Sequence, residues 1–318
     1  MTEKSNDCGP NTETDGDGSQ LAAIRSSDSL AKLRDRIGAG SVHEAYFEAK
    51  DHWKSTLDPT WWDVPVTGGI PGTCVRIDGT TFHVHGVTHA DTSEERSFLR
   101  ACVRQYLDGG ASVYCEQGIR PLYFRDFEGV CEMDDYRWAM EQCAQLPGES
   151  SLGPLEETAF DALLEDVGSI ASTFREATFS LIESGGSVYG DRFESVLADV
   201  ATAFVTDHAD LATAKNYESF SLSREASRNP DRLLDLQRYY ARAFLPQPLE
   251  REWLRRHDPE LELVTHARNE RMAEYAVYHN DTAREVHLIV GAAHGPGIRQ
   301  YLKQFQQGRA VSTSFDPL

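Results

Sequence analysis

The segment HLIVGAAHGPGIRQYL, residues 287–302, contains the clearest indication of the fold class. An apolar run ends at Gly291 and is followed by two alanines and His294. A Gly-Pro-Gly turn then leads into a stretch with helical periodicity. A buried strand that passes directly into a helix is typical of α/β proteins with a mainly parallel sheet. The histidine therefore stands where a buried strand ends.

The same α/β pattern occurs earlier in the chain. Residues 73–90, TCVRIDGTTFHVHGVTHA, predict two strands joined by a hairpin turn at Asp78-Gly79. Ser93 begins a predicted helix that ends at a Gly-Gly pair. The next segment, ASVYCEQG, predicts a short apolar strand that ends at Glu116. Strand, helix and strand in this order form a βαβ unit, so these two strands should be parallel.

The 318 residues predict a single α/β domain over residues 21–310. Its core is split into two parts, about 60–125 and 256–310. Between them, residues 126–255 follow the helical period throughout and predict a large helical insertion without a strand. Two further helices, at about 21–40 and 42–57, precede the core.

The formal net charge of −20 bears on the partners. Such an excess of acid argues against nucleic acid and anionic membranes, because both attract lysine and arginine. Acid spread along the whole chain, with little lysine, resembles the proteins of salt-accumulating halophiles, where salt screens the repulsion. The six cysteines include no CxxC pair, which argues against a zinc ribbon or a thioredoxin-like site.

The two ends of the chain predict tails. Residues 1–20 are polar and acidic, which indicates a disordered segment and not a secretory signal. Residues 311–318 form a short C-terminal tail. No stretch approaches the roughly 20 apolar residues that span a bilayer. We therefore expect a cytoplasmic protein without a membrane segment; the sequence does not indicate its oligomeric state.

Two stretches share the pattern Gly-x-x-His at the end of a predicted strand, Gly86 to His89 and Gly291 to His294. Ligands of parallel sheets bind at the carboxyl ends of the strands, so we expect both histidines to face one pocket. Glu116 also ends a strand, and a buried carboxylate needs a partner or a metal ion. Two histidines and one glutamate are the ligand set of several hydrolytic zinc sites.

These residues also have structural interpretations. A single histidine after a strand is more often a hydrogen-bonded structural residue than a ligand. Glu116 is spaced to pair with Arg120, four residues further on. Arg268 lies on the predicted helix before the last strand, where it either holds a carboxylate or an oxyanion in the pocket or lies on the surface.

The combination of these patterns resembles the TraB/PrgY/Tiki superfamily over residues of about 75–125 and 260–306. The family pattern has a first GxxH, a glutamate with an arginine four residues on, an Arg-Asn-x-x-Met helix, and a second GxxH before a glycine-rich helix start. All four elements are present in order, as Gly86 and His89, Glu116 and Arg120, Arg268 with Asn269 and Met272, and Gly291 and His294.

The resemblance implies an α/β fold shared with erythromycin-esterase-like and haem-binding ChaN-like proteins. In the Tiki branch it implies a peptidase that uses a divalent metal ion, such as Mn, Co or Zn, with both GxxH histidines and the glutamate at the site. The TraB/PrgY branch is linked to shutting down peptide pheromones. Members of these branches often carry a membrane segment, and no such segment is predicted here, which argues against a role at a membrane surface.

Three further histidines lie on predicted strands. His83 and His85 form an HxH pair, as in amidohydrolase metal sites, but that fold needs repeating β/α units that residues 126–255 do not supply. We expect His85 to support the metal ligands from behind, and His83 to be structural. His287 is expected to be a core residue with its hydrogen bonds satisfied.

The sequence thus leaves three functions open, each with a peptide or small molecule as partner. The first is a metal-dependent hydrolase, in which His89, Glu116 and His294 hold the ion and Arg268 holds the substrate or oxyanion. The second is an esterase-like hydrolase without a metal, in which a histidine is the general base. The third is a non-catalytic protein that binds its ligand under the helical insertion. The residues expected to support this site are His85, Gly86, Arg120, Asn269 and Gly291.

Overall fold

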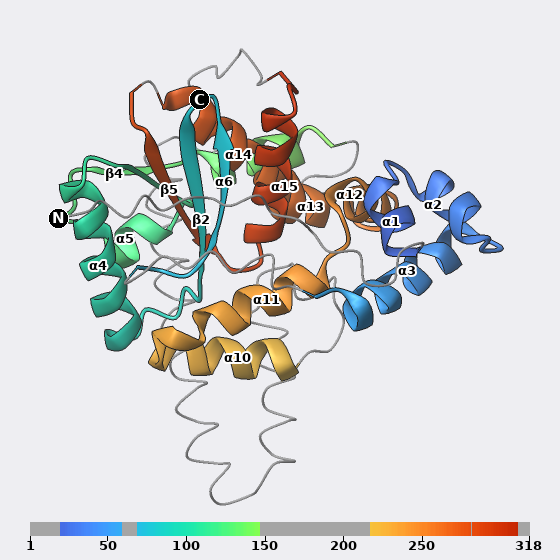
Figure 1. Cartoon of the computed structure of the whole chain (residues 1–318), viewed down its shortest axis with the longest axis horizontal. Coiled ribbons are helices and arrows are strands. Elements are labelled where there is room, and N and C mark those ends of the chain that lie inside the picture. Colours follow the sequence, from blue (N-terminus) through green and yellow to red (C-terminus); the bar gives the residue numbers. More distant parts are fainter. Residues whose placement is uncertain (1–19, 59–68, 147–216, 281, 311–318) are drawn as a thin grey trace, which may run out of the picture.

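The computed structural model describes residues 20–58, 69–146, 217–280 and 282–310. Within these ranges the chain forms a mixed α/β fold around a five-stranded sheet (Figure 1). The strand order is β1-β2-β5-β3-β4. The strands are β1 (Thr73–Ile77), β2 (Thr80–Val87), β3 (Ser112–Cys115), β4 (Val130–Glu132) and β5 (Glu285–Gly291). Only the β1–β2 pair of this sheet is antiparallel, which confirms the predicted hairpin and the mainly parallel sheet.

Strand β5 comes last in the sequence but lies between β2 and β3 in the sheet. Its register pairs Gly291 with Val87 of β2 and Ile289 with Cys115 of β3. Because all three strands are parallel, their carboxyl ends meet at one edge of the sheet. His89, Glu116 and His294 all follow these carboxyl ends within a few residues.

Alternating side chains of the strands supply two separate cores, as expected for a sheet covered on both faces. On one face, Val87, Val113 and Ile289 pack with Leu99 and Leu236 from helices. On the other face, the buried strand residues pack with side chains of the last two helices; this second core includes Val84, Leu288, Val290, Met272, Ile298 and Leu302.

The helices occupy both faces of this sheet. The first face is covered by α4 (Ser93–Asp108), α5 (Ile119–Tyr123), α10 (Tyr217–Arg228) and α11 (Leu233–Ala243), with the short turn η2 (Pro230–Arg232) between the last two. The second face is covered by α14 (Arg268–His279) and α15 (Gly295–Gln306). Helix α6 (Asp135–Ala144) packs beside α14 and the π-helical turn η3 (Leu263–Ala267).

A third group of helices lies to one side of the sheet (Figure 1). It contains α1 (Gln20–Ser26), α2 (Leu30–Ile37), α3 (Val42–Thr56) and α12 (Gln247–His257), and α13 (Pro259–Glu262) leads from it to η3. These helices share a small core of their own. Lys50 of α3 and Glu250 of α12 form an ion pair beside this core, with 2.7 Å between Nζ and Oε1.

Two predicted features differ in the structure. The single helix expected at 21–40 is two helices, because Ser29 caps α2 by accepting a hydrogen bond from the Lys32 amide. The region 126–255, expected to contain no strand, contributes β4 to the edge of the sheet. Three residues are too few to show an alternating pattern, so this segment carries no strand signal in the sequence.

Helices α6, α10, α11 and α12 agree with the helical character predicted for 126–255. Residues 147–216 of that region lie outside the described residues, as do 1–19 and 311–318, where tails were predicted. Within the described part of the chain, no helix combines the length and the apolar character needed to cross a membrane.

Candidate functional site

His89 lies in the turn that follows β2 and has a left-handed backbone, with φ at +59°. Few residues other than glycine adopt this conformation unless their surroundings hold them in it. Here the buried Glu95 of α4 accepts hydrogen bonds from the Thr88 amide at 2.8 Å and from the Tyr123 hydroxyl at 2.5 Å. The same hydroxyl accepts from the Asp91 amide at 3.0 Å. The turn is therefore anchored on both sides of His89, whose side chain is 25% exposed.

Glu116 follows β3 and is buried. The Gly291 amide at the end of β5 donates to its Oε2 at 2.6 Å. Arg268, the first residue of α14, donates from Nη2 to its Oε1 at 2.7 Å. Both carboxylate oxygens are thus fixed by neighbouring elements, and the carboxylate plane has one defined orientation.

His294 stands between β5 and α15 and is buried. Its Nδ1 lies 2.7 Å from Asn269 Oδ1 on α14, and Asn269 Nδ2 donates to Gln247 Oε1 at 3.1 Å. Because the amide oxygen of Asn269 can only accept, His294 carries a proton on Nδ1, and in the neutral ring Nε2 has the lone pair. Gly297 permits this contact, since a Cβ at that position would overlap Asn269.

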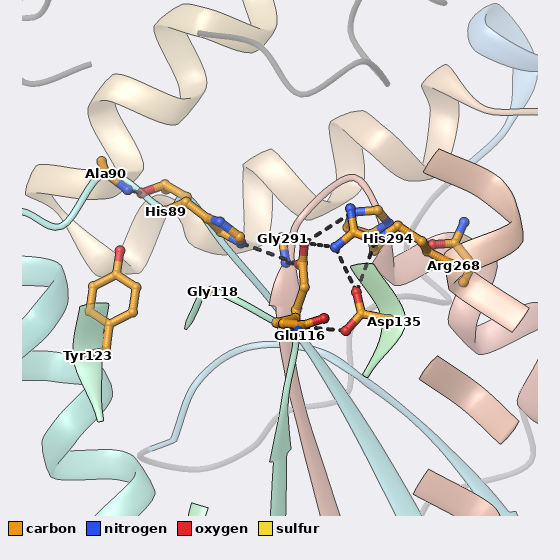
Figure 2. Close-up of polar contacts among 12 residues, drawn as sticks. His89, Ala90, Glu116, Gly118, Tyr123, Asp135, Arg268, Gly291 and His294 are labelled. Atoms are coloured by element: carbon orange, nitrogen blue, oxygen red, sulfur yellow. Dashed lines mark hydrogen bonds and ion pairs between the residues drawn. The ribbon is translucent and has the colours of Figure 1, made fainter. Parts of the chain in front are cut away.

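The two imidazoles converge on opposite oxygens of the same carboxylate. His89 Nε2 lies 3.4 Å from Glu116 Oε2, and His294 Nε2 lies 3.4 Å from Glu116 Oε1. Figure 2 shows His89 approaching Glu116 from one side, with His294 and Arg268 on the other. The predicted meeting of residues far apart in the sequence is thus present in the fold.

Gly291 borders the space between these three side chains. A Cβ built on Gly291 would lie 3.1 Å from His89 Nε2, 3.3 Å from Glu116 Oε2 and 3.5 Å from His294 Cδ2. A larger residue would therefore project into the space that all three side chains face. The glycine of the second GxxH keeps this space open.

Arg268 is enclosed and joins two carboxylates. It lies 2.7 Å from Glu116 Oε1 and also 2.7 Å from Asp135 Oδ2, and its side chain is only 4% exposed. The sequence predicted that Arg268 would hold a substrate or an oxyanion. In the structure it holds Glu116 and Asp135, two residues of the protein itself.

The charges around Glu116 keep it ionised. Burial by itself raises the pKa of this carboxyl, but His294, His89 and Arg268 outweigh burial and hold the pKa well below its usual range. Asp135 shows the opposite result. Burial, together with the nearby Glu116, raises its pKa despite the contact with Arg268.

Two of the supporting residues, Arg120 and His85, have roles other than those expected, whereas Gly86 permits a close approach, as a glycine in a GxxH pattern should. Arg120 donates from Nε to the Val130 carbonyl at 3.1 Å, and Arg268 takes the place beside Glu116. Gly86 allows close packing of β2 against the turn after β5. A Cβ added at this position would lie only 2.8 Å from Ala292 Cα, so a larger residue would not fit. His85 was expected to support the metal ligands, but its ring is hydrogen-bonded to the Pro71 carbonyl and to His287 instead.

A second group of ligand-type side chains lies on β2 and β5, and it has the residue types to hold a metal ion. His83, His287 and Glu285 each offer one ligand atom, and these atoms all lie within 4.8 Å of one another. His83 and His287 are buried and Glu285 is exposed. The sequence had assigned structural roles to both histidines. His83 Nδ1 is buried without a hydrogen-bond partner among the described residues, so its expected structural role does not account for it.

Burial keeps the imidazoles of this second group neutral. It lowers the pKa of His83 and of His287, and it lowers that of His85 to about 3. A neutral imidazole offers a lone pair to a metal ion or to a hydrogen-bond donor.

Two participants of the Glu116 site were not predicted. Asp135 reads in the sequence as an ordinary acid in the first turn of a helix. Gln247 follows a proline and resembles a helix-start residue. Both come from the region assigned to the insertion, and no local pattern distinguishes them from surface polar residues.

Comparisons of this chain with protein-family models, with curated proteins and with solved structures found no match, so the geometry of the site carries the functional argument.

Proposed function

We propose that this chain is a hydrolase of the TraB/Tiki type that cleaves a carbonyl-containing bond, with peptides as the substrate class. One observation carries the proposal. Two imidazole nitrogens, from His89 and His294, each lie 3.4 Å from a different oxygen of the buried Glu116 carboxylate. A structural role for these histidines would require neither the shared carboxylate nor the space beside Gly291.

The residues fit the divalent metal ion that the family resemblance implies. Two imidazoles and one carboxylate are the donor set of hydrolytic zinc sites, and Mn or Co also accept such ligands. His89 Nε2 is buried and has no hydrogen-bond partner among the described residues. A bound divalent ion would lower the pKa of a water molecule and polarise the substrate carbonyl.

The protein's own groups prepare this site. Asn269 holds the proton of His294 on Nδ1, which directs the Nε2 lone pair toward Glu116. Arg268 keeps Glu116 anionic within a buried environment. His89 is partly exposed, so the substrate approaches from its side.

A second mechanism, without a metal ion, is favoured by a different observation. Both oxygens of Glu116 already accept hydrogen bonds, from Arg268 and from the Gly291 amide. A carboxylate held in this way can orient an imidazole and stabilise its protonated form. His89 would then take a proton from the attacking water as general base, and Glu116 would stabilise the resulting imidazolium.

The test begins with the full chain, purified without a histidine tag, in wild-type form and as His89→Ala. Metal content is measured by elemental analysis, and hydrolysis is measured on fluorogenic peptide and ester substrates before and after exhaustive chelation. Activity that is lost on chelation, restored by Mn, Co or Zn and absent from His89→Ala supports the metal-dependent hydrolase.

The other outcomes separate the alternatives. Hydrolysis that survives chelation but is lost in His89→Ala supports the general-base mechanism. A ligand that co-purifies with the protein, without turnover of any substrate, would replace both with a binding function. Equal hydrolysis by wild type and His89→Ala would reject the site itself.

A further inference from the structure

The second group of ligand-type residues lies within the sheet and away from Glu116. His83 of β2 and His287 of β5 are directly paired in the parallel register. His83 lies four positions before Val87, where β2 ends, which corresponds to about 13 Å along the strand. Glu285 lies two residues before His287, so its side chain extends from the same face of the sheet.

A chain of hydrogen bonds fixes the proton positions in this group. His85 Nδ1 lies 3.2 Å from the Pro71 carbonyl, which can only accept, so His85 carries its proton on Nδ1. His85 Nε2 lies 2.9 Å from His287 Nδ1. Because His85 Nε2 has no proton, it must accept a hydrogen bond from the Nδ1–H group of His287. The neutral His287 ring consequently has its lone pair on Nε2, the remaining nitrogen.

Metal-binding histidines in proteins show this same arrangement. The ligating ring donates its other N–H group to a carbonyl, a carboxylate or a further acceptor, which orients it and increases its basicity. Here His85 provides that acceptor, and the Pro71 carbonyl fixes His85 in turn. The Tyr106 ring stacks on His287 at a centroid distance of 3.7 Å and holds the plane of the imidazole.

His83 supplies the independent observation. Its Nδ1 is buried and has no hydrogen-bond partner among the described residues, although its side chain is enclosed and polar. Leaving such a buried polar atom without a partner destabilises the folded protein, and a coordinated metal ion would remove that cost. The His83 ring is stacked beside His287 with 4.7 Å between centroids, so both rings present their edges in the same region.

We propose that His83, His287 and Glu285 form a zinc-binding site, separate from the Glu116 site, in which His85 positions His287. Imidazole ligands favour zinc and its neighbours in the transition series over magnesium or calcium. Zinc bonds of about 2.0–2.1 Å in a tetrahedral site place ligand atoms about 3.4 Å apart. The separations of up to 4.8 Å therefore close by about 1.4 Å on binding, and the exposed Glu285 is the ligand free to move.

This inference does not depend on the proposed hydrolase, because the two sites share no residue. Full-length protein without a histidine tag is stripped of metal and titrated with Co²⁺, whose visible absorption reports coordination, and with Zn²⁺ in competition. Wild type and His89→Ala should both bind one equivalent at this site. Glu285→Gln should weaken that binding at least tenfold, since it replaces a charged ligand at an exposed position.

His83→Gln should weaken the same equivalent by at least tenfold, while His89→Ala leaves it in place. Two exposed residues elsewhere provide matched controls, Glu260→Gln on α13 and His279→Gln on α14, and both should bind as wild type does. Metal affinity of Glu285→Gln and His83→Gln within about twofold of wild type would overturn the proposal, as would the absence of any Co²⁺ or Zn²⁺ equivalent insensitive to His89→Ala.

The positioning role of His85 has its own readout. His85→Phe removes the acceptor of the His287 proton but none of the three ligands. Loss of such a supporting hydrogen bond typically lowers metal affinity 10–100-fold. The Co²⁺ spectrum should keep the band positions of wild type at saturation, because the ligand set is unchanged. Unaltered affinity in His85→Phe would show that His85 does not position His287.

Discussion

Arg268 and Glu116 form an ion pair in which each side chain is only 4% exposed, with 2.7 Å between Nη2 and Oε1. The pair joins the start of α14 to the end of β3. Asp135 lies at the same distance from the guanidinium, so one positive charge is shared by two carboxylates. Such an arrangement stabilises the folded protein only while all three partners are present, because each is costly to bury alone.

Replacing Arg268 with methionine should therefore destabilise the protein strongly. The substitution leaves Glu116 and Asp135 buried without their cation, and breaking a buried pair in this way costs about 3–5 kcal/mol. Urea unfolding at pH 7 measures the free energy of unfolding. Arg255→Met is the matched control, because Arg255 is 55% exposed and pairs with Glu262 at 3.2 Å. That variant should lose less than about 1 kcal/mol, and equal losses in the two variants would contradict the assignment.

Gly291→Ala should impair the site while leaving the fold intact. The added methyl group would lie 3.1 Å from His89 Nε2 and 3.3 Å from Glu116 Oε2, in the space that these side chains face. We expect hydrolysis or metal binding at this site to fall at least tenfold, with a change in the melting temperature of only a few degrees. Gly109→Ala, at the end of α4, is the control and should keep full function. Unchanged function in Gly291→Ala would mean that this space is not used.

Much of the architecture could be predicted because local sequence patterns specify its strands and turns. The apolar run before His294 and the Asp-Gly turn at residue 78 each specify a strand or a hairpin through neighbouring residues alone. The carboxyl ends of parallel strands lie at the same edge of a sheet, and this rule predicts that His89, Glu116 and His294 lie close together. Residues far apart in the sequence could therefore be placed together, because each strand was recognised from its own local pattern.

The partners of these residues could not be predicted, because they depend on packing between distant helices. Asp135 meets Arg268 across 133 positions of the chain, and Gln247 reaches Asn269 from another helix. The His83–His287 pair was missed for a related reason. Its significance depends on the register of β2 against β5, and a register is set by the whole sheet.

Buried neutral histidine makes the stability depend on pH, and His266 provides the clearest case. Burial lowers its pKa from 6.5 to about 4. As the pH falls below about 6.5, the unfolded chain binds a proton that the folded protein does not accept until about pH 4. Stability is therefore lost over this window, by up to about 1.4 kcal/mol per pH unit for this one group.

His266→Gln should make this pH dependence shallower by about that amount. Free energies of unfolding measured between pH 6.5 and 4, with a chelator present to remove metal ions, give the slope directly. His257→Gln, at an exposed histidine of α12, should leave the slope of the wild type unchanged. A slope for His266→Gln equal to that of the wild type would show that His266 is protonated in the folded state over this range.

Tyr123→Phe should loosen the turn that carries His89. The hydroxyl donates to Glu95 and accepts from the Asp91 amide, so its removal leaves a buried carboxylate and a backbone amide each short of one partner. The expected loss of stability is about 1–3 kcal/mol. Amide hydrogen exchange of residues 88–91 should become faster, because the left-handed backbone of His89 is no longer held from both sides.

Tyr114→Phe separates this local effect from a general loss of stability. Tyr114 also donates from a largely buried ring, to the His279 carbonyl at 3.1 Å, but it lies on the other face of the sheet. It should lose a similar amount of stability without faster exchange at residues 88–91. If both variants accelerate exchange there equally, the turn is held by the fold as a whole and Tyr123 has no special part in positioning His89.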